Sequence, residues 1–217
     1  MLLQLGGEPW TDTRVSFADW GAMKPTTKWG QLPFMKLQDG TEMTQTLPIV
    51  HFLASKIAVG GGSKMYPGDD AMAAYKIDEM IAAFEDLRPK LAATYIINPK
   101  DKEEKEAARA ALFEPDGAGT AIMLKLEAQC AGAGRVVATA DGAFTVADLW
   151  AFCFLNFLRC GFWVGLPNDY LNAATYPKLV EIVDAFGSIP AVRAYYTEAV
   201  EKNKMYAVFA ATELVSA

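Results

Sequence analysis

Histidine and cysteine are scarce in this 217-residue chain, which has one histidine, His51, and three cysteines, Cys130, Cys153 and Cys160. The cysteines show neither CxxC spacing nor a Cys/His ligand pattern, so the sequence predicts no zinc site, and their odd number does not suggest a disulfide framework. His51 is expected on a helix surface, which excludes a Ser/His/Asp triad and a histidine-based metal cluster. This cysteine usage favours the cytoplasm or another reducing compartment.

An excess of positive charge is also lacking. The chain carries 20 basic and 26 acidic side chains, a formal net charge of −6. Such a balance repels a polyphosphate backbone, so nucleic acid is not an expected partner. The first residues, Met1 to Leu5, lack the basic segment and the long apolar segment of a secretory signal.

No apolar run is long enough to cross a membrane. The most apolar window, residues 144–166, is interrupted by Asp148, Asn156 and Arg159, and a membrane-spanning helix needs about 20 consecutive apolar residues. We therefore expect no membrane span, and the window is interpreted as a fully buried helix.

The first part of the chain, residues 1–59, has the mixed pattern of a small α/β unit. Short strand-like pieces at residues 14–17 and 34–37 alternate with helical patches. Asp39-Gly40 lies between the alternating pieces 34–37 and 42–44, which predicts a tight antiparallel hairpin. Apolar residues then recur every three or four positions over residues 47–57, the spacing of one helical face.

The second part of the chain is predicted to be all-helical. Gly60-Gly61-Gly62-Ser63 is a flexible stretch, so residues 60–68 are interpreted as a linker and residues 69–217 as a helical domain. Thr145-Val146-Ala147-Asp148 has the form of a capping box and is expected to start the buried helix. Apolar periodicity marks further helices at residues 77–87, 107–112, 122–131, 180–186 and 192–200.

Several motifs, taken in order, resemble the cytosolic glutathione transferases, and in particular their sigma class. They are Ala18-Asp19-Trp20 with Lys24, then residues 25–33 ending in Gln31-Leu32-Pro33, then Gln45-Thr46, and downstream residues 176–180 and 189–192. The resemblance covers nearly the whole chain. It implies a thioredoxin-like N-terminal domain, here shortened at its first strand, followed by an all-α domain.

The resemblance also implies a glutathione site. It places Trp20 and Lys24 near the glycyl carboxylate, because an indole N–H and an ammonium both donate hydrogen bonds to anions. It places Gln31, Leu32 and a cis Pro33 beside the cysteinyl backbone.

For the γ-glutamyl carboxylate the resemblance gives Gln45 and Thr46 at a helix N-terminus, an end that favours anions. Asp86 matches an acidic position that reaches the ligand's ammonium from a partner subunit, which implies a homodimer.

The tyrosine that activates the glutathione sulfur in this family lies on a first strand that we expect to be missing from the sequence. All eight tyrosines of this chain lie beyond residue 59 and are expected to serve packing. The sequence thus predicts no catalytic residue and leaves two functions open. One is a glutathione transferase that conjugates glutathione to a small apolar electrophile, or uses it to isomerise or reduce one. The other is a non-catalytic transferase-like subunit of a larger assembly.

Overall fold

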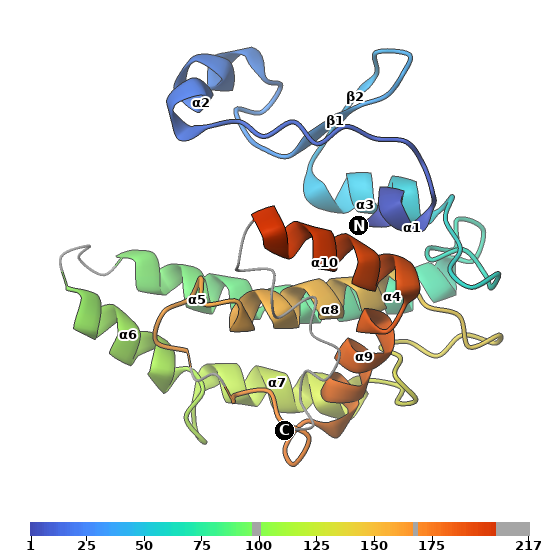
Figure 1. Ribbon diagram of the computed structural model, residues 1–217. Coiled ribbons are helices and arrows are strands. Elements are labelled where there is room, and N and C mark those ends of the chain that lie inside the picture. The colour runs from blue at the N-terminus through green and yellow to red at the C-terminus, as the bar shows by residue number, and fades with distance from the viewer. Residues whose placement is uncertain (97–100, 167–168, 203–217) are drawn as a thin grey trace.

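A computed structural model of the chain describes residues 1–96, 101–166 and 169–202. A bundle of helices forms the larger body, and a small N-terminal unit projects from one side of it (Figure 1). This arrangement confirms the predicted fold, an α/β unit followed by an all-helical domain. Tyr206 lies outside the described residues.

The N-terminal unit is built around a two-stranded antiparallel sheet. Phe34 pairs with Thr44 and Lys36 with Glu42, which confirms the predicted hairpin. At its tip Gly40 adopts φ 86°, a value that glycine tolerates without a steric penalty. The described elements are α1 (Leu2–Leu5), α2 (Phe17–Met23), the 3₁₀ turn Lys24–Thr26, β1 (Phe34–Lys36), β2 (Glu42–Thr44) and α3 (Thr46–Ala54).

The prediction of a strand at residues 14–17 is wrong. Ser16 instead caps α2, and its hydroxyl accepts a hydrogen bond from the Asp19 amide at 3.1 Å. Phe17 begins that helix with a fully exposed side chain. Two apolar residues in alternation are too weak a signal for a strand, and a serine placed three residues before an aspartate favours a helix start.

The helical domain contains the remaining helices, and its elements follow the predicted periodicity except around residue 86. The sequence marked one helix ending at Leu87, whereas α4 ends at Glu85 and a separate helix begins at Leu87. Pro89 falls in the first turn of this second helix, where proline is tolerated. The bounds are α4 (Ala71–Glu85), α5 (Leu87–Ile96), α6 (Lys102–Ala111), α7 (Ala118–Gln129), α8 (Val146–Arg159), α9 (Pro177–Gly187) and α10 (Pro190–Lys202).

Helix α8 runs through the centre of the body and packs against α4 and α9 (Figure 1). Its side chains Phe152 and Leu155 are completely buried, together with Phe84 of α4 and Phe186 of α9. The prediction of a buried helix in this window is confirmed for α8, although the helix ends at Arg159 and Phe162 and Val164, at the end of the window, are exposed. Among the described residues, none of the helices combines the length and the apolar character that crossing a membrane would require.

The predicted capping box at the start of α8 is confirmed. The Asp148 carboxylate is buried and accepts hydrogen bonds from the backbone amides of Val136 and Thr145, both at 2.6 Å. Burial raises the pKa of this carboxyl group, and the hydrogen bonds from Val136 and Thr145 oppose the rise. The carboxylate thus joins the loop before α8 to the first turn of that helix.

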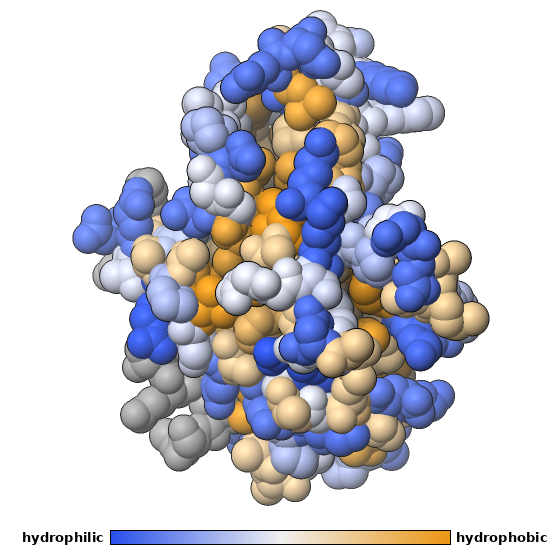
Figure 2. Space-filling view, turned by 90° about the vertical axis from the view of Figure 1, so that its right-hand side faces the viewer, coloured by the Kyte–Doolittle hydropathy of each residue, from blue (hydrophilic) through white to orange (hydrophobic). Residues whose placement is uncertain are grey.

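Residues 55–70, which include the proposed linker, connect α3 to α4 and touch both parts of the chain. The Met65 amide donates to Ile57, and the Met65 carbonyl accepts from the Val146 amide at the start of α8, each at 2.8 Å. Ser63 donates to the Asp141 carboxylate through its amide and its hydroxyl. These bonds fix the N-terminal unit against the helical body, and apolar side chains gather at the surface near their junction (Figure 2).

Candidate functional site

The predicted glutathione residues of the N-terminal unit gather around the hairpin and the start of α3. The Leu32–Pro33 peptide bond directly precedes β1 and is cis, the configuration that the family resemblance implies. Leu32 itself is exposed, with 48% of its surface accessible. This residue is therefore accessible to a ligand.

Gln45 joins β2 to α3 through an unusual backbone. Its φ is 70°, a region that non-glycine residues rarely occupy and that costs about 1–3 kcal/mol. Its side chain donates to the Gln31 side chain at 3.3 Å, so two predicted site residues are brought together. Such strain often marks a ligand-binding position, because surrounding contacts must hold it in place.

Trp20 and Lys24 lie on α2 and on the turn that follows it. Trp20 is half-buried and Lys24 is exposed. Within the described part of the chain, neither side chain forms a hydrogen bond or an ion pair. The indole N–H and the ammonium are therefore free to donate to a ligand.

Asp86 is separated from this group. It caps the C-terminal end of α4 in the helical domain, and its side chain is exposed. This placement fits a role toward a second subunit, and that role stays a prediction.

A pocket of about 500 Å³ lies between the N-terminal unit and the helical body. Its walls come from α1, α3, α5, α8 and α10, elements that lie far apart in the sequence. Thr46, the first residue of α3, lines the pocket as well as belonging to the predicted glutathione site. The two sites therefore adjoin at Thr46.

The pocket is mainly apolar. Leu149, Phe154 and Phe157 of α8 form much of one wall, and Val50 and Leu53 of α3 face them. Among the described lining residues, Arg88 has the only charged side chain. An apolar cavity with few polar groups is the usual form of a site for a small organic molecule.

A thiol and a phenol hydroxyl also line the pocket. The Cys153 thiol lies 3.9 Å from the Tyr196 hydroxyl, and burial raises the pKa of this thiol. Cys153 therefore stays protonated at neutral pH, and its low thiolate fraction makes it a poor nucleophile. The sequence assigned Tyr196 to packing, and it does pack on Phe152. Its position in the pocket could not be read from helical spacing.

His51 follows the predicted site on α3. Its ring stacks on Tyr66 with centroids 4.2 Å apart, and its Nε2 lies 3.0 Å from the Asp78 carboxylate. These contacts connect α3 to the connecting segment and to α4, so His51 is a half-buried contact residue. In the described part of the chain, no group of three or more histidine, cysteine or acidic side chains is arranged to hold a metal ion.

The chain is similar to several known proteins, although no family model matches it. It is 33% identical over 108 residues to the class-mu 28 kDa glutathione S-transferase of Schistosoma japonicum, covering 48% of this chain and 49% of that protein. It is 27% identical over 196 residues to glutathione S-transferase S1 of Drosophila melanogaster, covering 89% and 70% respectively. The first of these matches thus spans about half the length of the relative.

The fold has counterparts among solved structures. A sigma-class glutathione transferase of Fasciola hepatica superposes with a TM-score of 0.64 at 24% identity, covering 93% of this chain and 87% of that one. This likeness supports the fold, and the relatives support the family that the sequence motifs suggested.

Proposed function

Because this chain belongs to the cytosolic glutathione transferase family, we propose that it binds glutathione through its N-terminal unit and presents the thiol to a small apolar electrophile. The observation that carries the proposal is the position of Thr46. This residue belongs to the predicted glutathione site and also lines the apolar pocket. A ligand held at the start of α3 would therefore lie next to the pocket, which offers space for a second substrate.

The proposed contacts follow the chemistry of the tripeptide. Trp20 and Lys24 donate to the glycyl carboxylate, and Gln31, Leu32 and Pro33 lie along the cysteinyl backbone. Gln45 and Thr46 meet the γ-glutamyl carboxylate at the N-terminus of α3, where backbone amides and the helix dipole favour an anion. Charge-assisted hydrogen bonds of this kind are stronger than neutral ones.

Asp86 completes the proposed site only across a twofold dimer, in which it meets the ammonium of glutathione bound to the partner. We therefore propose a homodimer. Light scattering after size-exclusion chromatography measures the mass of the particle in solution and is expected to give twice the mass of one chain.

The proposed reaction is a nucleophilic substitution or addition. With chlorodinitrobenzene, the glutathione sulfur would form a bond to the ring carbon that bears chlorine, chloride would leave, and the thiol proton would pass to solvent. The thiolate is the reactive form, so the rate depends on a group that lowers the thiol pKa.

The test is calorimetric titration with glutathione, followed by conjugation of chlorodinitrobenzene on the same sample. Lys24→Ala is expected to weaken glutathione binding about tenfold, because one charge-assisted hydrogen bond is lost. Lys36→Ala is the matched control, since Lys36 is an exposed lysine on β1 of the same unit and its ammonium lies over the Phe34 ring. The affinity of the Lys36→Ala variant for glutathione is expected to stay unchanged.

Each result has a distinct meaning. Binding with turnover supports a transferase, and binding without turnover favours the second candidate, a non-catalytic subunit of a larger assembly. A folded chain that does not bind glutathione contradicts the proposed function.

A further inference from the structure

The single histidine of the chain, His51, lies where the N-terminal unit meets the helical body. It belongs to α3, and it contacts Tyr66 of the connecting segment and Asp78 of α4. Histidine is the side chain whose charge ordinarily changes between about pH 5 and 8. The junction therefore contains a group whose charge follows mild changes in acidity, and no second histidine adds to its response.

Both oxygens of the Asp78 carboxylate are engaged at this junction. One lies 3.0 Å from His51 Nε2, and the other accepts a hydrogen bond from the Tyr66 hydroxyl, also at 3.0 Å. The two rings are stacked on each other, with an angle of 14° between their planes. His51 Nε2 and the carboxylate oxygen next to it are both shielded from solvent. Partly buried charges are screened less than exposed ones, so this contact is sensitive to the charge of the imidazole.

The other titratable groups around the cluster do not change charge with it. Burial, together with the Asp78 carboxylate, raises the pKa of Tyr66, so the phenol stays protonated below about pH 8. Lys56, further along α3, has its ammonium 4.6 Å from the centre of the Phe52 ring. Glu79, the next acid of α4, accepts a hydrogen bond from a tyrosine of its own helix at 2.8 Å. Protonation of the imidazole therefore acts first on Asp78.

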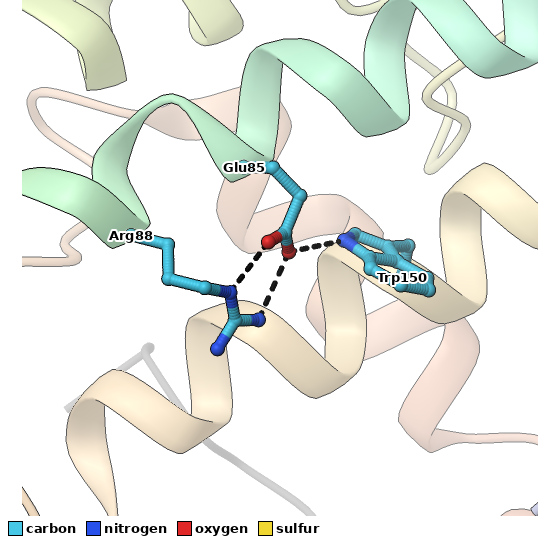
Figure 3. Close-up of polar contacts among 3 residues, drawn as sticks. All are labelled: Glu85, Arg88 and Trp150. Atoms are coloured by element: carbon cyan, nitrogen blue, oxygen red, sulfur yellow. Dashed lines mark hydrogen bonds and ion pairs between the residues drawn. The ribbon is translucent and has the colours of Figure 1, made fainter. Parts of the chain in front are cut away.

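Helix α4 is itself held by the rest of the helical body. Glu85, its last residue, accepts a hydrogen bond from the Trp150 indole of α8 at 3.0 Å and another from Arg88 of α5 at 2.9 Å (Figure 3). Helix α3, in contrast, follows the hairpin directly, because only Gln45 separates β2 from its first residue. A contact between α3 and α4 therefore connects the hairpin to an anchored helix.

We propose that His51, Tyr66 and Asp78 form a pH-dependent latch that holds the N-terminal unit against the helical body. In the protonated imidazole, the positive charge lies beside the Asp78 carboxylate and over the face of the Tyr66 ring, and both contacts are attractive. In the neutral imidazole, the carboxylate retains the phenol but loses the opposite charge. The stabilisation is therefore present at about pH 5.5, where a free imidazole is protonated, and lost by about pH 8.

Urea denaturation of wild-type and His51→Gln protein at about pH 5.5 and about pH 8 tests the latch, since glutamine is uncharged at both values. Subtracting the variant from the wild type cancels the pH dependence of the other groups. The difference between the two midpoints is expected to be about 0.3 M urea larger at the acidic pH, the size given by a partly exposed ion pair. In an Asp78→Asn background, the same comparison is expected to show no dependence on pH. Glu79→Gln is the matched control background, since Glu79 is an exposed acid of the same helix, and there the dependence is expected to persist.

Equal midpoint differences at the two pH values would overturn the proposal, as would a pH dependence that survives in Asp78→Asn. Hydrogen exchange of the wild-type chain gives a test that needs no variant. The amides of Met65 and Tyr66 donate to the carbonyls of Ile57 and Ala54 at the junction. After correction for the intrinsic effect of pH on exchange, their protection is expected to be about threefold higher at the acidic pH, and equal protection would contradict the latch. Neither measurement uses glutathione, so the latch and the proposed function can fail separately.

Discussion

Replacing Phe152 with alanine is expected to lower the free energy of unfolding by about 3–5 kcal/mol. Phe152 lies in the middle of α8 and is completely buried. Its ring is 5.3 Å from that of Phe186 in α9 and 5.8 Å from that of Tyr196 in α10. Alanine would leave a cavity where three helices meet, because close-packed neighbours relax only partly into the empty volume.

Urea denaturation followed by circular dichroism measures this change. Phe17→Ala is the matched control, because the Phe17 side chain is fully exposed and surface substitutions usually change stability by no more than about 0.5 kcal/mol. Equal effects of the two substitutions would contradict the position of α8 at the centre of the core.

Asp148→Ala is expected to cost about 3–5 kcal/mol of unfolding free energy, again measured by urea denaturation. The substitution leaves the amides of Val136 and Thr145 buried without an acceptor. Each buried donor that loses its partner costs about 1–3 kcal/mol, and the helix cap is lost as well.

Comparison with Asp70→Ala separates the effect of burial on stability from the effect of losing a helix cap. Asp70 caps α4 and accepts from the amides of Met72 and Ala73, both at 3.0 Å, but this site is exposed. Water can replace the lost acceptor there, so the expected cost is about 1 kcal/mol. A loss for Asp148→Ala no larger than that for Asp70→Ala would show that burial adds nothing to the capping box.

The local elements of this fold could be predicted well because their signals are contiguous in the chain. The Asp39-Gly40 turn predicted the hairpin, and Thr145 with Asp148 predicted the start of α8. Errors arose where a signal was short. Residues 14–17 contain only two apolar residues in alternation, and capping by Ser16 decided their structure.

Part of the candidate site was also accessible from sequence. Trp20, Lys24 and Gln45 belong to ordered motifs within one short segment, so a family resemblance could be recognised from them. That segment encodes the proposed glutathione contacts other than Asp86, and calorimetry with glutathione remains their test.

The sequence by itself determined the helix faces, the hairpin, the capping box and the order of motifs that reveals the family, because each depends on residues close together in the chain. Only the tertiary structure decided that Thr46, Arg88 and Tyr196 share one pocket with α8. These residues come from separate helices, and helical spacing shows which side of a helix is apolar but not which other helix it meets. Packing of α4 against α8 also brought the Trp150 indole to Glu85, the i,i+3 partner of Arg88. The position of Arg88 in the pocket wall therefore depends on the folded chain.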